Sequence, residues 1–258
     1  MLAQQRQAAI LDRVRAAGGV RVSELATEYN VSDMTIRRDL EALADRGLIA
    51  KVHGGATTVT PGSAHEPGFA AKSVRQQAEK AAMAMRAAAL VSPGDAIALS
   101  AGTTTAGLAQ RLVDVPALTV VTNSIPVADI FYRAGRPDQT VVLTGGTRTP
   151  SDALVGPVAV AAIGTLHLDM LFLGVHGMSE RAGYTTPNLM EADVNRALVQ
   201  AAERLVVLAD HTKWGTVGIS SIVPLHRADV VITDDGIDDT ARAVLAEQVN
   251  DLMVVSPQ

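Results

Sequence analysis

Apolar residues in the first part of the chain recur at the spacing of an α-helix. Residues 3–17 are predicted to form a helix that two glycines end, with three apolar positions on one face: Ile10, Leu11 and Val14. A second, shorter helix is predicted from Ser23, a good N-cap residue, to Tyr29. Both helices are amphipathic and need a partner to cover their apolar sides.

The third predicted helix carries the clearest apolar stripe. It runs from Asp33 to about residue 46, Ser32 caps it, and its stripe is spaced by four and then three residues: Ile36, Leu40 and Leu43. A strand is predicted over 48–52, and the two glycines at 54–55 predict a turn. Three helices followed by a strand and a turn predict a winged helix-turn-helix.

Beyond the turn the pattern changes twice. Residues 57–73 are rich in Thr, Pro, Gly, Ser and His without periodicity, which predicts a linker between a domain at 1–56 and a domain at 74–258. From there strand-like and helix-like runs alternate. Strands are predicted near 96–99, 118–122, 140–144, 169–174, 204–209, 229–233 and 252–255, and helices near 74–91, 104–112, 125–134, 153–165, 189–202 and 238–248. This alternation predicts an α/β domain with a mostly parallel sheet and helices on both faces.

The amino-acid composition excludes several kinds of site and cellular location. The 258 residues are 48% apolar, which suffices for a large core, and the chain has no cysteine, which excludes disulfides and thiolate chemistry. The six histidines show no metal-ligand spacing, so we expect neither a metal site nor a cofactor. The N-terminus does not resemble a signal peptide, and the most apolar stretch, 81–91, is interrupted by Arg86 and too short to span a bilayer. We therefore expect a cytoplasmic protein with no membrane partner.

The net charge of −5 argues against binding to nucleic acid, but the charge is unevenly distributed. Residues 1–55 hold 8 of the 22 basic and 7 of the 27 acidic residues, which leaves 14 basic and 20 acidic residues in the remainder. Attraction to phosphate depends on where the arginines and lysines lie more than on the total.

The third predicted helix supplies candidate DNA contacts. Thr35, Arg37 and Arg38 lie off the apolar stripe, next to the cap at Ser32, and arginine suits both guanine edges and phosphates. Lys51 and His53 fall on the predicted wing, where backbone or minor-groove contacts are expected. An ordinary solvated helix with surface charges is the alternative interpretation.

The amino-acid sequence of this region favours DNA contacts over an ordinary solvated helix. The stretch "VRVSELATEYNVSDMTIRRDLEALADRGLIAKVHGGA", residues 20–56, closely resembles the head of the DeoR family of bacterial regulators. The resemblance implies that 31–40 belong to the recognition helix and that double-stranded operator DNA is a partner. Because one short helix makes few base contacts, we expect two heads on a homo-oligomer, a dimer or tetramer, to read two half-sites.

In the larger domain a turn of small residues lies between a predicted strand and a predicted helix. Free backbone N–H groups at a helix N-terminus suit a phosphate, although such turns also serve as plain N-caps. The turn lacks the Gly-x-x-x-x-Gly-Lys pattern of nucleotide triphosphatases. Its residues are Ser100, Ala101, Gly102, Thr103, Thr104 and Thr105.

Further polar residues fall at the carboxyl ends of other predicted strands, the edge where parallel sheets bind ligands. Any one of them could instead cap a helix or line a loop, but together they favour an effector site. They are Asn123, Gly146, Arg148, His176, Asp210 and Lys213.

The segments "AGTTTAGLAQRL", "TVVTNS", "LTGG", "DMLFLGVHGM", "GYTTPNLMEADV" and "LADHTKWG" resemble the effector domain of the same family. The resemblance implies a fold similar to ribose-5-phosphate isomerase and the CoA transferases. It also implies an effector phosphate at 102–105 and a role for Asp210 and Lys213. Two positions depart from the family: Ser100 stands where many members have Asp, and Lys72 stands where Arg is expected.

Catalysis is the main alternative to sensing. Isomerisation of a sugar phosphate needs a carboxylate base, which the related isomerases place after the strand equivalent to 169–174. Here the segment 175–178 has none. Glu191, the only nearby acid, stands at a helix start, and we expect it to contact the effector rather than to act as a base. We expect no catalytic residue and no enzyme, but a repressor of a sugar-metabolism operon that a phosphorylated sugar releases. The alternatives are an isomerase-like enzyme with an appended head and a constitutive DNA-binding protein with a vestigial sensor.

Overall fold

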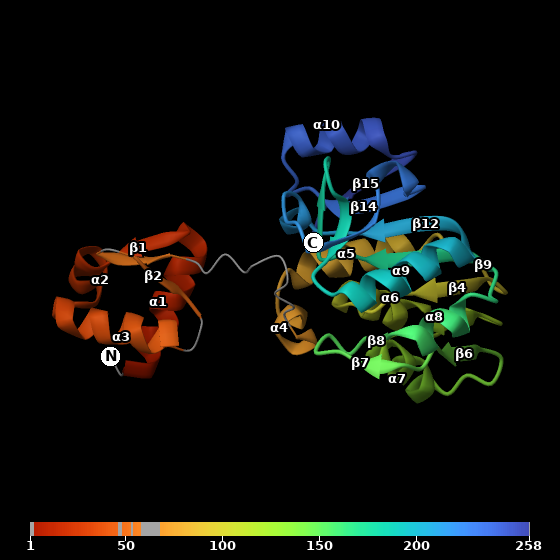
Figure 1. Cartoon of the computed structure of the whole chain (residues 1–258), viewed down its shortest axis with the longest axis horizontal. Coiled ribbons are helices and arrows are strands. Elements are labelled where there is room, and N and C mark those ends of the chain that lie inside the picture. The colour runs from red at the N-terminus through yellow and green to blue at the C-terminus, as the bar shows by residue number, and fades with distance from the viewer. Residues whose placement is uncertain (1–2, 46–47, 53, 58–67, 258) are drawn as a thin grey trace. The chain divides into compact units, whose positions relative to one another are not determined.

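A computed structural model describes residues 3–45, 48–52, 54–57 and 68–257. The chain divides into two compact units, residues 1–62 and 63–258, and each is described by itself (Figure 1). Within the described residues, none of the helices is both long and apolar enough to cross a membrane.

The first unit is a small helical domain with a three-stranded sheet. Its elements are α1 (Ala3–Ala17), β1 (Gly19–Arg21), α2 (Val22–Tyr29), α3 (Asp33–Asp45), β2 (Ala50–Val52) and β3 (Gly55–Thr57), and the antiparallel sheet has the order β1-β3-β2. The predicted stripe is confirmed, since Ile36, Leu40 and Leu43 are buried together with Ile10 and Val14. The unit is a winged helix-turn-helix in which β2 and β3 form the wing.

Two expectations for this part of the chain were wrong. Helix α2 begins at Val22, one residue before the predicted cap Ser23, because the Val22 N–H donates to the Gly54 carbonyl in the wing turn at 2.9 Å. The predicted linker is not irregular throughout. Thr57 ends β3 and Phe69–Ser73 form a short helix, α4, while 58–67 lie outside the described residues.

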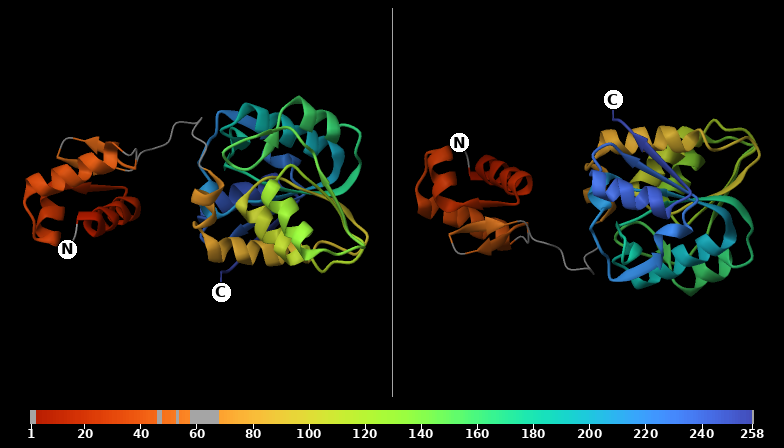
Figure 2. Two further views of the ribbon diagram at one scale, coloured as in Figure 1. Left: turned by 90° about the horizontal axis from the view of Figure 1, so that it is seen from below. Right: turned by 90° about the horizontal axis from the view of Figure 1, so that it is seen from above.

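The second unit is a three-layer α/β domain (Figure 2). Its central sheet is entirely parallel, in the order β15-β14-β12-β9-β4-β5-β6. The strands are β4 (Ala96–Leu99), β5 (Thr119–Thr122), β6 (Thr140–Leu143), β9 (Leu168–Gly174), β12 (Ala202–Leu208), β14 (Val230–Asp234) and β15 (Asp251–Val255). All seven predicted strands are confirmed. Continuous apolar runs fit the central strands, because a parallel sheet is covered on both faces.

Helices cover both faces of this sheet. One face packs against α5 (Gln77–Ala88), α6 (Thr103–Leu112) and α7 (Ile125–Ala134). The other packs against α8 (Pro157–Ile163), α9 (Leu189–Ala201) and α10 (Asp239–Gln248). These positions confirm the predicted helices, with α5 and α8 shorter than expected.

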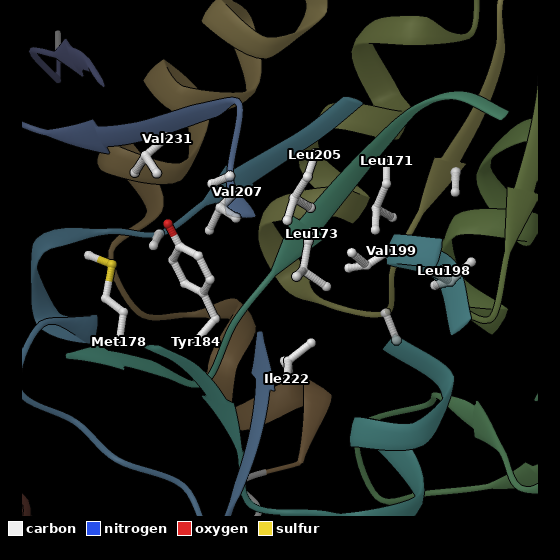
Figure 3. Close-up of a cluster of buried hydrophobic side chains, with 14 of the residues drawn as sticks. Leu171, Leu173, Met178, Tyr184, Leu198, Val199, Leu205, Val207, Ile222 and Val231 are labelled. Atoms are coloured by element: carbon white, nitrogen blue, oxygen red, sulfur yellow. The ribbon is translucent and has the colours of Figure 1, made fainter. Parts of the chain in front are cut away.

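Short strands that were not predicted complete the domain. β7 (Thr147–Arg148) and β8 (Leu154–Val155) form a hairpin, and β10 (Gly177–Ser179), β11 (Gly183–Thr186) and β13 (Ser220–Val223) form a small antiparallel sheet. Tyr184 of β11 is fully buried and fills the space between this small sheet and the central one, beside Leu173, Met178 and Val207 (Figure 3).

Candidate DNA-binding surface and effector site

Helix α3, the predicted recognition helix, begins where the sequence predicts. The Ser32 hydroxyl accepts a hydrogen bond from the Thr35 N–H at 3.3 Å and lies 2.9 Å from the Thr35 hydroxyl. Arg37 and Arg38 are exposed and lie off the buried stripe. The helix therefore presents two guanidinium groups to solvent, the arrangement that contact with bases or phosphates requires.

A buried ion pair that the sequence interpretation missed holds this helix to α1. The Asp39 carboxylate accepts hydrogen bonds from Arg6 Nε at 2.6 Å and from Gln7 Nε2 at 3.0 Å. Both charged side chains are at most 10% exposed. Asp39 follows Arg38 directly, so the pair fixes α3 to α1 at a buried residue next to the exposed arginines.

The wing packs beside the recognition helix. Lys51 Nζ of β2 lies 2.9 Å from Glu41 Oε1 of α3, and this hydrogen bond holds the pKa of the exposed Glu41 below its usual value. A hollow of about 260 Å³ lies between the two elements and is lined in part by Met34, Arg37 and Lys51. Lys51 therefore lies on the wing as predicted, and the structure adds its contact with α3, whereas His53 lies outside the described residues.

In the larger unit the predicted phosphate turn is a helix N-terminus. Gly102 is the N-cap of α6 with an extended φ of 165°, and the Thr105 hydroxyl donates to the Gly102 carbonyl at 3.0 Å. The N–H groups of Thr103, Thr104 and Thr105 belong to the first turn, where an α-helix offers no internal acceptor. The turn can thus bind an anion through backbone donors at the positive end of the helix dipole.

Two of the predicted site residues support this turn from beneath. Ser100 and Asn123 are fully buried. Ser100 Oγ accepts from the Gly174 N–H at 2.9 Å, and Asn123 Oδ1 accepts from the Ala101 N–H at 2.9 Å while its Nδ2 donates to the Leu154 carbonyl at 3.2 Å. Their side chains therefore hold β4, β5, β8 and β9 in register around the turn.

Asp210 and Lys213 lie on the loop after β12, at the same carboxyl edge of the sheet. Asp210 is buried and caps a single 3₁₀ turn, His211–Lys213, by accepting from the Thr212 N–H at 3.1 Å and from the Thr212 hydroxyl. Lys213 Nζ lies 3.9 Å from Asp210 Oδ2 and remains 28% exposed. This loop offers one ammonium group, oriented by a buried carboxylate, to a ligand at the edge.

A second amine, missed in the sequence, lies near this loop. Lys80 Nζ of α5 donates to the carbonyls of Lys72 and Arg75 at 2.7 and 2.6 Å. The pKa of Lys80 is lowered chiefly by burial; Asp210 opposes the shift, while the positive charges of Lys213, Lys72 and Arg75 add to it. Several cations and one carboxylate are thus close enough to interact, and such a field attracts anions.

Side chains at the junction of α4 and α5 contact residues on both sides of the carboxyl edge of the central sheet. Lys72 Nζ donates to Ser151 Oγ at 2.9 Å on one side. On the other, Gln76 Nε2 lies 3.3 Å from His211 Nε2, and His211 Nδ1 lies 2.6 Å from Asp234 Oδ2. Asp234 also accepts from the His211 backbone N–H at 2.8 Å, so the ring position is fixed from β14.

Four remaining candidates have structural contacts. At Gly146 (φ 118°) a Cβ atom would lie 2.5 Å from the Val155 carbonyl, and Arg148 pairs with Asp152 at 2.6 Å. The His176 N–H donates to the Thr185 carbonyl at 3.1 Å, and the Glu191 carboxylate accepts from the Thr186 hydroxyl at 2.8 Å in the first turn of α9. A separate hollow of about 460 Å³ lies between α8 and α9, and none of these four residues lines it.

A winged helix-turn-helix and an α/β unit with a candidate anion site in one chain are typical of a DNA-binding regulator with a sensor domain. Two family models make the class specific. Residues 6–61 match the DeoR-like helix-turn-helix domain, and residues 75–235 match the DeoR C terminal sensor domain. The chain belongs to the DeoR family of transcriptional regulators, as the sequence resemblance indicated.

Similar proteins agree over nearly the full length. The chain is 38% identical to an uncharacterised HTH-type transcriptional regulator, YgbI, of Escherichia coli K12, over 98% of both chains. It is 36% identical to the regulator GlpR of Haloferax volcanii over 94% of both, and 34% identical to a putative aga operon transcriptional repressor of Escherichia coli O157:H7 over 90% of this chain and 87% of that one. Ribose-5-phosphate isomerase A of Neisseria gonorrhoeae aligns over 56% of each chain with 14% identity and a TM-score of 0.40, too low to support a conclusion.

Proposed function

We propose that this regulator represses a sugar-metabolism operon and releases its operator when a phosphorylated sugar binds the second unit. The observation that carries the proposal is the group of amines at the sheet edge that also carries the α6 N-terminus. Lys213 Nζ lies 3.9 Å from Asp210 Oδ2, and the charge of Lys80 interacts with those of Asp210, Lys213, Lys72 and Arg75. The name of one relative, a putative operon repressor, supports repression as the sign of regulation.

Each group has a role in this proposal. The phosphate binds the N–H groups and hydroxyls of 103–105 at the start of α6. Lys213 and Lys80 neutralise the remaining charge, and Asp210 accepts a hydrogen bond from a sugar hydroxyl. The Ser100 hydroxyl accepts a hydrogen bond from the Gly174 N–H. Because many family members have Asp at this position, this part of the proposed site lacks the carboxylate that they have.

The junction of α4 and α5 transmits the signal. It follows the segment that leads from the DNA-binding head, and it contacts the effector edge through Ser151 and through His211. A ligand that moves the 210–213 loop changes these contacts and so alters where the heads of a homo-oligomer stand. Effector and operator then weaken each other's binding by the same factor.

Turnover is not part of the proposal. An isomerase needs a carboxylate free to move a proton between two carbons. The nearest candidate, Glu191, is buried and accepts a hydrogen bond from Thr186 in the first turn of α9, where the helix dipole favours a negative charge. A measured isomerisation rate above background with pentose or hexose phosphates would contradict this part.

Replacing Lys213 with alanine is expected to abolish the response to effector while leaving operator binding intact. A panel of sugar phosphates is first screened by thermal shift, since a ligand at 100 times its Kd stabilises by about 2.7 kcal/mol. Gel shifts then test release of the operator by the hits. The matched control is Arg204→Ala, at the opposite end of β12, which should respond like the wild type. Undiminished release in Lys213→Ala would contradict the assigned site.

Replacing Arg37 or Arg38 with alanine is expected to weaken operator binding by about 1–3 kcal/mol each if the side chain is bidentate to a base. Arg13→Ala is the control, because Arg13 is an exposed arginine of the same unit on α1. Fluorescence anisotropy with operator and with unrelated DNA separates base contacts from phosphate contacts, since loss of a phosphate contact weakens both equally. Operator affinity equal to that of Arg13→Ala for both variants would remove α3 as the reading helix.

A further inference from the structure

The strand β6 forms an unprotected end of the central sheet. It pairs only with β5 among the described strands, and β15 occupies the opposite end (Figure 1). All four of its residues are exposed, including Val141 at 37%, Val142 at 38% and Leu143 at 44%. Exposed β-branched and aliphatic side chains on both faces of an edge strand mark a surface that pairs with another strand.

The hydrogen bonds of β6 determine which backbone groups are available. The N–H groups of Thr140 and Thr144 donate to the carbonyls of Leu118 and Thr122 at 3.0 Å, so the even-numbered residues face β5. Because backbone groups alternate in direction along a strand, those of Val141 and Leu143 face the free edge. Any incoming strand must bond to these two residues.

The edge also lacks the charges that normally prevent such pairing. Residues 139–147 contain no charged side chain, whereas proteins commonly protect edge strands with lysine, proline or a bulge. The opposite edge differs: β15 begins at the exposed Asp251, and the residues that follow are partly buried against the core. An uncharged strand can approach an identical strand without repulsion.

We propose that β6 pairs antiparallel with β6 of a second copy of this chain, with Val142 on the two-fold axis. Val141 then lies opposite Leu143 of the second copy, and the reverse, so that each pair exchanges two backbone hydrogen bonds. This is the symmetric register in which both outward-facing residues of β6 find partners within the strand, because an axis at Val141 or at Leu143 would pair only that residue with its own copy. The two central sheets become one continuous sheet.

A strand of four residues is too small for a stable dimer by itself, since stable interfaces bury about 1,200–2,000 Å². Helix α7 packs against β6 and carries Tyr132, whose side chain is 82% exposed. Pairing at β6 brings the α7 helices of the two copies toward each other on one face of the joined sheet. Aromatic residues such as tyrosine are enriched in interfaces of this kind.

The proposal shares with the proposed function the need for a second copy, but it requires neither operator nor effector. A second copy is the occupant argued for because this uncharged strand can pair with an identical strand without repulsion. A two-fold axis relates identical patches, and one register satisfies both strands. The same axis provides the symmetric pair of heads that two half-sites require.

A cysteine at position 142 tests the register directly, because the full-length chain has no other cysteine. Residues opposite each other in a non-hydrogen-bonded antiparallel pair have Cα atoms about 4.5 Å apart, within the range of a disulfide. Copper phenanthroline, which oxidises two thiols to a disulfide, is expected to convert Val142→Cys mainly into a covalent dimer. The control is Val217→Cys, because Val217 is an even more exposed valine (45% against 38%) far from β6 in the sequence, and this variant should stay monomeric on the gel.

Sedimentation of the wild type and of Val142→Lys provides a second measurement. The wild type is expected to sediment as a dimer or larger. Val142→Lys places two ammonium groups at the two-fold axis, so it should shift toward the monomer. Its far-UV circular dichroism spectrum should be unchanged. A monomeric wild type would overturn the proposal. So would a dimeric wild type in which Val142→Cys does not cross-link, or one in which Val217→Cys cross-links equally well. Operator and effector assays play no part, so failure here leaves the proposed function to its own tests.

Discussion

Replacing Asp39 with alanine is expected to destabilise the N-terminal unit by about 3–5 kcal/mol, because it leaves the buried Arg6 guanidinium without its partner. Natural domains are stable by about 0.05–0.15 kcal/mol per residue, so this loss is comparable with the whole stability of a unit of 62 residues. Operator binding should fall with it, since α3 loses its attachment to α1. Urea unfolding of the full-length chain, followed by helical circular dichroism, measures the effect.

Glu41→Ala is the matched control for this prediction. Glu41 lies two residues further along the same helix and also pairs with a basic residue, Lys51, but its side chain is 59% exposed. Exposed ion pairs contribute little because water already solvates both charges. Equal urea midpoints for Asp39→Ala and Glu41→Ala would contradict the assignment of Arg6 and Asp39 as the buried anchor of the recognition helix.

The repeating features of both units could be predicted from the sequence because they are local. The stripe of Ile36, Leu40 and Leu43 predicts a buried helix face, and the Ser32 cap lies next to the helix it starts. Likewise, each central strand is a short apolar run buried on both faces, which periodicity can detect. The parallel sheet followed from their alternation with helices.

Contacts between distant residues could not be predicted in this way. Arg6 and Asp39 are 33 positions apart, and nothing in either local pattern indicates the pair. The short strands β7, β8, β10, β11 and β13 are also set by their partners, since two to four residues carry too little periodicity to predict a strand.

The candidate effector site also combines local features that the sequence predicts with contacts between distant residues that it does not. The turn at 100–105 was visible as a strand, small residues and then a helix. Sequence could not show that Ser100 and Asn123 point inward to support the turn, or that Lys80 from α5 lies near Asp210. The ends of the strands predicted where the candidate site lies, whereas Lys80 of α5 is brought to it only by the fold.

Replacing Tyr184 with alanine is expected to destabilise the larger unit by about 3–5 kcal/mol, the cost of removing a large aromatic side chain from a well-packed core. Tyr184 is fully buried, and its ring separates the small antiparallel sheet from the central sheet at Leu173 and Val207 (Figure 3). The small sheet carries Thr186 and its hydrogen bond to Glu191, so the cavity should also loosen the start of α9.

Tyr184→Phe separates the ring from its hydroxyl. Burial raises the pKa of Tyr184, and the hydroxyl donates only a long hydrogen bond of 3.4 Å to the Leu225 carbonyl, so its loss should cost about 1 kcal/mol or less. The two units have separate cores, with Ile10 and Leu40 in one and Tyr184 in the other. In calorimetry, Tyr184→Ala should therefore lower the midpoint temperature of one unfolding transition, and Asp39→Ala should lower that of a different one. If either variant lowered the midpoints of all transitions by the same amount, the two units would unfold as one. The model in which a sensor acts on independently folded heads through a connecting segment would then be wrong.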